Sequence, residues 1–412
     1  MRVLLISANT EAISMRPLPL GLGLVAASTR RAGHEVALLD LFGAPHPLEA
    51  VQRAIASHRP AVIGLSVRNI DDQCREEPRF FLSDTRALVE ACRSVTTAPI
   101  VLGGAGYSIF PREALSYLGG DFGIASDGEV AFPAFLDRLG SGDPSPDLPG
   151  VYAPGREPRA GRALPDDLDS LPLWDEALPC ADPEQWIPVQ SRRGCPNDCS
   201  YCSTSSIQGR RIRFRSPRLV AETVGALASQ GGRRFFFVDN TFNIPEAYAL
   251  ELCRALSDVR PRVSWRCIVY PHRLSPQLAA AMAASGCREV SLGFESGCKH
   301  ILRIMNKRFT PDDIRQSAEM LAAQGIGVLG FLLLGMPGET AGSVEESLEF
   351  ARSLPLQGLR VTVGVRIYPG TALARQAIAE ALVASDDALL QPRFYPTPGL
   401  DEWIGRSREL ST

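Results

Sequence analysis

The sequence lacks long apolar runs and carries little excess charge of either sign. Its longest apolar stretches, such as the one within residues 330–335, have strand length and fall short of the roughly 20 residues that a membrane-spanning helix needs. The 43 basic and 46 acidic residues leave a net charge of −3, which disfavours a broad phosphate-binding surface. We therefore expect no membrane segment and no nucleic acid, and a small molecule as the substrate.

A cleavable signal peptide and low-complexity tracts are also missing. The first seven residues have strand length and lack both the long apolar run and the cleavage site of a secretory signal. We therefore expect a cytoplasmic protein. In that compartment ten cysteines are more typical of metal or redox chemistry at a few positions than of a disulfide framework.

A chain of 412 residues is long enough for two domains. In residues 1–140, short apolar runs alternate with helical patterns, which is typical of a parallel sheet with helices on both faces. We expect a flavodoxin-like doubly wound α/β domain there, with its ligand beyond the carboxyl ends of the strands. The predicted strands are 3–7, 35–40, 61–66, 99–103 and 121–125, and the predicted helices include 18–31, 79–94 and 129–139.

Residues 141–185 are rich in Pro, Asp and Gly without helical periodicity, so we expect a linker. The alternation of strands and helices resumes in residues 186–370 and predicts a partial (β/α)6 barrel with its site at the carboxyl ends of the strands. Residues 371–412 form a C-terminal extension without an assignable pattern. The predicted barrel strands are 187–191, 234–239, 263–269, 289–294, 327–334 and 359–367, and the predicted helices are 217–229, 245–256, 276–284, 311–324 and 343–353.

Three closely spaced cysteines, Cys195, Cys199 and Cys202, directly follow the first predicted strand of the barrel. Three thiolates in a CxxxCxxC pattern can bind three irons of a [4Fe-4S] cluster and leave the fourth iron open to another ligand. A zinc knuckle is the alternative, but zinc usually takes four ligands in two paired spacings. The spacing, the preceding strand and the repeated βα units together predict an iron–sulfur cluster.

Residues 186–371, with this cysteine loop and three later segments, resemble a radical S-adenosylmethionine (SAM) enzyme of the coproporphyrinogen-oxidase and methylthiotransferase type. The resemblance implies that SAM binds the open iron, with further contacts from the carboxyl ends of the second, fourth and fifth barrel strands. The implied contact residues are Asp239, Asn240, Glu295, Ser296 and Gly330. Each has a structural alternative, since Asp239 and Asn240 can cap a turn, Glu295 can cap the next helix, and Gly330 can simply allow close backbone approach.

Two other barrel residues have two interpretations each. Arg266, on the third predicted strand, pairs either with the methionyl carboxylate of SAM or with a structural acid. Tyr368, at the end of the sixth, is assigned a catalytic role as a proton or hydrogen-atom donor, with packing as the alternative. The basic run 209–218 either attracts an anionic ligand or forms a solvated face.

The first domain resembles the cobalamin-binding domain of cobalamin-dependent radical SAM enzymes. Ser66 falls at the family's third-strand serine, and Gly103 and Gly104 fall at its paired glycines. The resemblance implies that the glycines let the nucleotide tail of cobalamin pass close to the backbone, and that the serine binds the buried dimethylbenzimidazole. Residues 127–129 resemble the GEGE-type end of the family's fifth strand.

The DxHxxG loop that supplies an axial histidine in many cobalamin domains is missing after Ser7. We therefore expect cobalamin to bind without a histidine from the protein on cobalt. The loop 67–73, which includes Arg68 and Asn69, is expected to face cobalt from below.

Together these resemblances imply a cobalamin-dependent radical SAM methyltransferase that acts on an unactivated carbon or phosphorus of a small biosynthetic metabolite. A one-electron reductant such as flavodoxin or ferredoxin is the implied protein partner. The same cofactors would also serve a rearrangement or a cyclisation. In a third alternative, the first domain is an interaction module and the barrel works without cobalamin. Methyl transfer and rearrangement or cyclisation would all need both cofactors, so each predicts one substrate cavity between the domains, shared by both cofactors.

Overall fold

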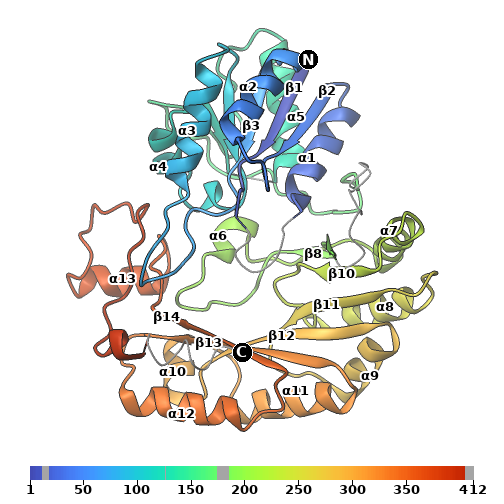
Figure 1. Ribbon diagram of the computed structural model, residues 1–412, viewed down its shortest axis with the longest axis vertical. Coiled ribbons are helices and arrows are strands. Elements are labelled where there is room, and N and C mark those ends of the chain that lie inside the picture. The colour runs from blue at the N-terminus through green and yellow to red at the C-terminus, as the bar shows by residue number, and fades with distance from the viewer. Residues whose placement is uncertain (12–17, 126, 174–184, 404–412) are drawn as a thin grey trace.

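The computed structural model describes residues 1–11, 18–125, 127–173 and 185–403. They form two α/β units, which lie one above the other in Figure 1. The upper unit contains the N-terminal part of the chain and the lower unit the C-terminal part. Each unit has its own six-stranded sheet, and a third, two-stranded sheet lies between them.

The sheet of the first unit has the strand order β2-β1-β3-β4-β5-β6. Strands β1 to β5 are parallel, and the short β6 is antiparallel to β5. The order 2-1-3-4-5 is that of flavodoxin-like domains and confirms the predicted fold class. Five strands were expected in this unit. The sixth, β6, comes from the segment that was predicted to be only a linker. The strands are β1 (Arg2–Ser7), β2 (Glu35–Asp40), β3 (Val62–Ser66), β4 (Ile100–Gly103), β5 (Phe122–Ile124) and β6 (Val151–Tyr152).

Helices cover both faces of this sheet. Along β1, Val3 and Leu5 pack with α1 and α5, whereas Leu4 and Ile6 pack with α2, α3 and α4 on the opposite face. Successive side chains of a strand point to opposite faces, so a strand covered on both sides is apolar at every position. The helices are α1 (Leu20–Arg31), α2 (Pro47–His58), α3 (Leu82–Arg93), the 3-10 helix η1 (Tyr107–Ile109), α4 (Pro111–Leu118) and α5 (Gly128–Gly140).

The sheet of the second unit is fully parallel, and its six strands neighbour one another in chain order. This is the arrangement of consecutive βα units in a barrel that does not close, as predicted. The strands are β7 (Trp186–Val189), β10 (Arg234–Phe237), β11 (Ser264–Val269), β12 (Cys287–Glu295), β13 (Gly327–Leu334) and β14 (Gly358–Val363). Strands β8 (Arg192–Arg193) and β9 (Arg213–Phe214) form the separate two-stranded sheet.

Helices lie on the face of the barrel sheet that points away from the first unit (Figure 1). On β13, Val328, Leu332 and Leu334 pack with these helices, while Leu329, Phe331 and Leu333 are only half-buried and face the inside of the barrel. These helices are α7 (Pro217–Ser229), α8 (Glu246–Ser257), α9 (Pro276–Ala284), α10 (Lys299–Ile304), α11 (Pro311–Ala323) and α12 (Ala341–Arg352). The short helix α6 (Thr204–Gln208) lies instead between the two units (Figure 1).

The extension after the barrel contains a helix that the sequence pattern did not indicate, α13 (Ala372–Ala379). Its first turn is capped by Thr371, whose hydroxyl accepts a hydrogen bond from the Ala374 amide at 3.1 Å. Leu373 donates its amide to the Ser200 carbonyl at 2.9 Å. The extension therefore packs against the loop that carries the three cysteines.

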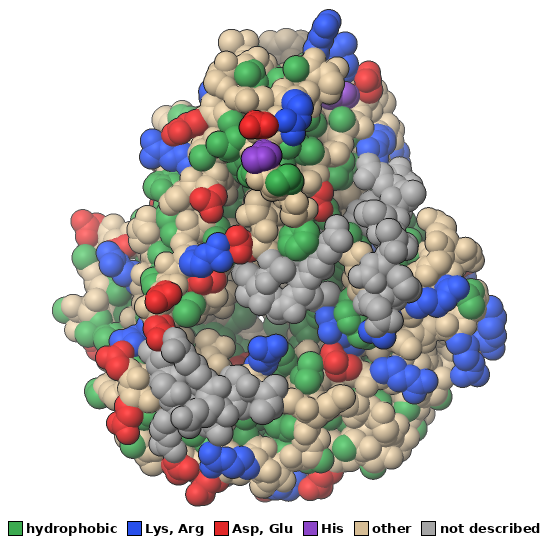
Figure 2. All heavy atoms as spheres, in the orientation of Figure 1, with side chains coloured by type: hydrophobic (Ala, Val, Ile, Leu, Met, Phe, Trp, Pro, Cys, Tyr) green, Lys and Arg blue, Asp and Glu red, His purple; other side chains and the backbone are tan. Residues whose placement is uncertain are grey.

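The face visible in Figure 2 carries acidic and basic side chains on both units. Basic side chains gather at its right edge, beside α7 and α8, and acidic ones at its left, beside α12 and α13. This mixture agrees with the small net charge. No helix within the described ranges is long and apolar enough to cross a membrane.

Candidate functional site

The cysteine loop, residues 194–203, follows β7 and β8 at the carboxyl edge of the barrel sheet. It begins at Gly194, which has φ +97°, and a Cβ there would lie 2.1 Å from the Arg211 carbonyl oxygen. Only glycine fits this left-handed position against a neighbouring backbone. The loop therefore leaves β8 in one fixed direction.

The three thiols of the loop lie close enough to influence one another. Burial raises the pKa of the Cys199 thiol to about 11, Lys307 lowers it, and charge on Cys202 and Cys195 raises it further. Burial also raises the pKa of Cys195. The raised pKa values of Cys195 and Cys199 are compatible with an iron centre, because bound iron replaces the protons of its thiolate ligands and compensates their charge.

The described residues contain no group of three His, Cys, Asp or Glu side chains that converges on a single metal ion. The zinc alternative needs four ligands around one ion. A [4Fe-4S] cluster binds each thiolate to a different iron, so its cysteines need not converge in this way. The loop thus fits the predicted cluster, and its three cysteines stay predicted ligands.

Asp239 lies where the second barrel strand ends, but its carboxylate is bonded to the neighbouring backbone. It is fully buried and accepts hydrogen bonds from the backbone amides of Ser191 at 2.8 Å and Arg192 at 3.1 Å. Burial raises its pKa, and the Arg192 guanidinium acts in the opposite direction. These bonds support the capping alternative, in which Asp239 fixes the strand that leads into the cysteine loop.

Asn240 is connected to the cysteine loop by Gln208, a residue that the sequence pattern did not indicate. Its amide nitrogen Nδ2 donates to Oε1 of Gln208 at 2.8 Å, and the same oxygen accepts the Gly194 amide at 3.1 Å. Gln208 ends α6, the short helix after the third cysteine. Asn240, Gln208 and the start of the loop therefore form one hydrogen-bonded group.

Glu295 and Ser296 are adjacent in sequence but have different surroundings. Glu295 faces the cysteine loop and accepts a hydrogen bond from Lys307 Nζ at 3.3 Å. Ser296 is fully buried, and its hydroxyl lies 2.8 Å from that of Ser347 on α12. Glu295 therefore stays a candidate for the site, whereas Ser296 joins the end of β12 to a helix.

Gly330 lies on the helix-covered side of β13, not inside the barrel. A Cβ there would lie 2.7 Å from Leu356 Cδ1 and 2.9 Å from Phe294 Cε1. The alternative of close packing is therefore favoured for Gly330. Later in the same segment, Glu339 accepts the backbone amides of Gly335 at 2.5 Å and Met336 at 3.1 Å, which fixes the turn after β13.

Arg266 lies in the middle of β11 and not at its carboxyl end. Its guanidinium pairs with Glu289 at 3.1 Å and lies over the rings of Trp186 at 4.4 Å and Phe236 at 4.6 Å. Of its two interpretations, this geometry supports pairing with a structural acid.

Tyr368 is packed between the units. Its ring lies 6.4 Å from that of Phe110 in the first unit, and the Arg366 guanidinium lies 5.1 Å from its centre. Burial raises the pKa of its hydroxyl well above the usual value. These contacts favour the packing alternative for Tyr368.

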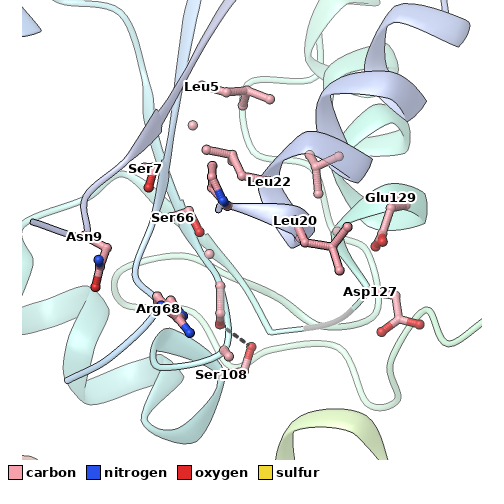
Figure 3. Close-up of a pocket in the computed structure, with 18 of the residues that line it drawn as sticks. Leu5, Ser7, Asn9, Leu20, Leu22, Ser66, Arg68, Ser108, Asp127 and Glu129 are labelled. Atoms are coloured by element: carbon pink, nitrogen blue, oxygen red, sulfur yellow. Dashed lines mark hydrogen bonds between the residues drawn. The ribbon is translucent and has the colours of Figure 1, made fainter. Parts of the chain in front are cut away.

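A cavity of about 440 Å³ opens between the two units (Figure 3). Four of the predicted cobalamin contacts line it, namely Ser66, Arg68, Gly103 and Gly104, while Asn69 is not among its lining residues. Its deep end lies between the first sheet and helices α1 and α5 and is mostly apolar. The lining there includes Leu5, Leu22, Gly64, Val101, Ile124 and Phe132.

The other wall of this cavity belongs to the second unit. Trp186 and Pro188 of β7, Phe236 of β10 and Arg193 of β8 line it. Ligands of both fold types bind beyond the carboxyl ends of their strands. The cavity is therefore bounded on one side by that edge of the first sheet and on the other by the barrel.

Gly104 is required by the backbone at the rim of the cavity. It has φ +99°, and a Cβ would lie 2.4 Å from the Val67 carbonyl oxygen and 3.0 Å from the Ser66 hydroxyl. The glycine thus lets the turns after β3 and β4 approach each other. This approach places Ser66 beside the paired glycines.

Buried ion pairs join the cysteine loop to the first unit. Arg193, directly before the loop, pairs with Asp127 at 3.1 Å and with Glu129, and Arg213 pairs with Asp127 at 2.6 Å. All four side chains are less than 10% exposed. Because Asp127 and Glu129 begin α5, the segment resembling a GEGE strand end supplies the partners of two barrel arginines.

These contacts also explain much of the basic run 209–218. Besides Arg213, Arg215 donates to the carbonyls of Leu171 at 3.1 Å and Pro172 at 3.2 Å. Arg218 pairs with Glu222 on α7. Within the basic run, Arg213 and Arg215 therefore hold the first unit and the connecting segment in place, whereas Arg211 and Arg218 are exposed, in line with the solvated-face alternative.

Replacing Arg193 with methionine is expected to lower the free energy of unfolding by about 3–5 kcal/mol, the usual effect of breaking a buried ion pair. The reason is that Glu129 and Asp127 stay buried with only Arg213 opposite. Denaturant titration of the cofactor-free protein measures this. Arg211→Met is the matched control, since Arg211 and Asp166 form an exposed pair and such pairs contribute about 0–1 kcal/mol. Equal losses in the two variants would contradict the prediction.

A second buried ion pair also joins the units. Arg366, just after β14, pairs with Asp71 of the loop after β3 at 2.9 Å, and both are less than 5% exposed. The same guanidinium donates to the Leu389 carbonyl at 2.8 Å. The loop predicted to lie below cobalt is thus tied to the barrel and to its extension.

Two family models match the chain, one for each unit. The model of the B12 binding domain matches residues 7–136, and the model of the Radical SAM superfamily matches residues 189–351. The first match begins at the last residue of β1 and covers β2 to β5. The second begins just before the cysteine loop and ends at α12.

Similar proteins span nearly the whole chain. An uncharacterized methyltransferase of Pyrococcus horikoshii is 26% identical and aligns with 93% of this chain and 84% of its own length. Cytidylyl-2-hydroxyethylphosphonate methyltransferase of Streptomyces wedmorensis is 24% identical, with 94% and 83% covered. The fold is similar to that of the radical SAM methyltransferase TsrM of Kitasatospora setae, solved with tryptophan and a SAM analog (TM-score 0.87, 22% identity, 99% of this chain and 88% of that chain). With a B12-binding domain followed by a radical SAM domain, the chain belongs to the cobalamin-dependent radical SAM enzymes.

Proposed function

We propose that this enzyme is a methyltransferase that acts on an unactivated carbon or phosphorus of a small biosynthetic metabolite. The observation that carries the proposal is the cavity between the units, which is lined by the predicted cobalamin residues and by Arg193 and Gln208, on either side of the cysteine loop. The small molecules named for two similar proteins, tryptophan and a phosphonate, agree with this substrate class. Tryptophan and a phosphonate differ too much from each other to assign a single substrate to this chain.

The residues of the chain would hold three groups. The three loop cysteines would bind the [4Fe-4S] cluster, Asn240 and Glu295 lie beside that loop for SAM, and Ser66 and the paired glycines lie at the mouth of the apolar pocket for the nucleotide tail of cobalamin. When bound, these groups supply a reductively cleaved carbon–sulfur bond and a methyl group carried by cobalt. The apolar walls of the cavity exclude water, which protects reactive species.

Cobalamin is proposed to bind without a histidine nitrogen from the protein on cobalt. The described residues that line the cavity include no histidine. Arg68, from the loop expected below cobalt, is among the lining residues, and burial lowers its pKa. A guanidinium retains its proton and is a poor metal ligand, so the lower face of cobalt would be left without a protein nitrogen.

Electron paramagnetic resonance of the cob(II)alamin-loaded protein is expected to lack superhyperfine splitting from an axial nitrogen. The same measurement on protein grown with 15N-labelled histidine should give an identical spectrum. A splitting that changes with the label would identify a histidine ligand and overturn the proposal.

The function itself is tested by the fate of SAM. Protein reconstituted anaerobically with iron, sulfide and cobalamin, then supplied with SAM, a reductant and candidate acceptors, should form S-adenosylhomocysteine only when cobalamin is present. A rearrangement or cyclisation enzyme would consume SAM without forming S-adenosylhomocysteine. An enzyme whose first domain is an interaction module would be indifferent to cobalamin.

The proposal includes a one-electron donor such as flavodoxin or ferredoxin, because reductive cleavage of SAM needs single electrons. It also includes a cytoplasmic location and no role for nucleic acid. The mixed charge of the visible face supports the last point, since nucleic-acid sites gather basic side chains on one surface.

A further inference from the structure

A buried lysine lies against the cysteine loop, in the turn that follows α10. The Lys307 side chain is 4% exposed, and its Nζ donates to Oε1 of Glu295 at 3.3 Å. Three aromatic rings surround the ammonium group, with centres 5.3 Å away for Tyr201, 5.9 Å for Tyr270 and 5.8 Å for Phe309. Lysine is almost never buried unless it is paired, so this position needs an explanation beyond packing.

The same turn holds the cysteine loop directly. Ser200 donates its amide to the Met305 carbonyl at 3.0 Å, and Asn306 Nδ2 donates to the Asp198 carbonyl at 2.9 Å. Asp198 and Ser200, the two loop residues in these bonds, flank Cys199. Lys307 is therefore held at a fixed place relative to the sulfurs.

The charge of the ammonium group acts on two of those thiols. Burial alone would lower the pKa of Lys307, but the Glu295 carboxylate reverses this and holds the pKa well above its usual value. Lys307 in turn acts to lower the pKa values of Cys199 and Cys195, against the effect of burial. A positive and a negative charge thus stand together beside the predicted cluster ligands.

Glu295 is held in this position at a local conformational cost. Its φ of +66° is in the left-handed region, and the pairing of β12 with β13 shifts register between Gly293 and Glu295. A non-glycine residue in this conformation persists only where its surroundings enforce it. The backbone here turns the carboxylate toward Lys307.

We propose that Lys307 is a positioning residue that sets the reduction potential of the iron–sulfur cluster, and that Glu295 moderates its effect. Reduction adds one negative charge to a cluster already bound by three thiolates. A fixed cation nearby stabilises the reduced form more than the oxidised form, and a fixed anion does the opposite. The inference rests on the proposed function only in that it requires the cluster to be present.

The test compares midpoint potentials of reconstituted variants in the absence of SAM, by redox titration followed by electron paramagnetic resonance. Lys307→Met should shift the potential negative by at least about 59 mV, a tenfold change in the reduction equilibrium for one electron. Glu295→Gln should shift it positive. The double variant should lie between the two single variants, and Lys307→Arg should lie close to the unmodified protein.

Lys299→Met is the matched control, because Lys299 is an exposed lysine on α10 and should leave the potential unchanged. Iron and sulfide are counted first in every sample. If Lys307→Met does not retain the cluster, the positive shift in Glu295→Gln and the retained potential in Lys307→Arg still decide the matter. A shift of the wrong sign, or none, in Glu295→Gln overturns the proposal.

An unchanged potential in Lys307→Met together with weaker SAM binding would also overturn it, and would make Lys307 a contact for the methionyl carboxylate. Failure of the proposed function would look different. Unmodified protein would then hold no cluster, or would form no cobalamin-dependent S-adenosylhomocysteine while its cluster potential still responded to Lys307.

Discussion

Replacing Cys195, Cys199 and Cys202 together with alanine should reduce bound iron and sulfide from about four of each per chain to near zero. These thiolates are the only protein ligands that the CxxxCxxC pattern provides, and three irons of the cluster lose their anchor when all are removed. The brown absorbance of the reconstituted protein should disappear with them. Iron and sulfide analysis after anaerobic reconstitution measures the effect.

The control for this experiment changes cysteines that lie elsewhere. Cys74 is exposed in the first unit, and Cys253 is buried in the barrel core. The double variant Cys74→Ala/Cys253→Ala should keep the full iron and sulfide content. A complete cluster in the triple loop variant would mean that other residues bind it, and the assignment of the site would be wrong.

Replacing Gly103 with phenylalanine should weaken cobalamin binding by at least about 100-fold, or about 2.8 kcal/mol. Gly103 ends β4 and lines the cavity, and the nearest atom to a Cβ there is the Ile124 carbonyl oxygen at 3.7 Å. The backbone therefore tolerates a side chain, but the ring would occupy space that the proposed ligand needs. Titration of the cluster-free protein with hydroxocobalamin, followed by absorbance, gives the affinity.

Gly342→Phe is the matched control for this variant. Gly342 is exposed on α12, and its Cβ would meet Thr340 Oγ1 at 3.7 Å, an ordinary contact distance. It should bind cobalamin like the unmodified protein. The Gly103 variant should keep its cluster, which separates a blocked pocket from a misfolded protein. Unchanged cobalamin affinity would place the ligand elsewhere.

The fold could be predicted because apolar strands and amphipathic helices alternate regularly in both halves of the chain. Elements without such periodicity were missed. Strand β6 has two residues, which is too short for a pattern, and it lies in a segment rich in Pro and Gly. Helix α13 has eight residues and is stabilised by a cap and by packing on the cysteine loop, so tertiary contacts decide it.

The sequence could predict that most candidate residues lie at or after strand ends, but not which contacts they make. Asp239 lies at a strand end, as expected, yet it accepts local backbone amides, and no pattern indicates which partner a carboxylate takes. Gly330 lies in a run of apolar residues, so its side of β13 could not be inferred from alternation.

Lys307 and Gln208 were missed for a different reason. Both reach the cysteine loop through hydrogen bonds or charge, but only Gln208 is near it in sequence. Lys307 lies in an ordinary helix-terminal turn, where a lysine is normally solvated. Only the three-dimensional arrangement of α10 behind the loop distinguishes it.

The buried ion pairs between the units limit how this protein can be recombined with its relatives. A chimera that joins this first unit to another barrel would place Asp127 and Glu129 opposite foreign residues, and Asp71 likewise. An unmatched carboxylate in such a place costs far more than a poorly packed apolar contact. Exchange of substrate-binding barrels among these enzymes would therefore succeed only when the residues corresponding to Arg193 and Arg366 are transferred as arginines.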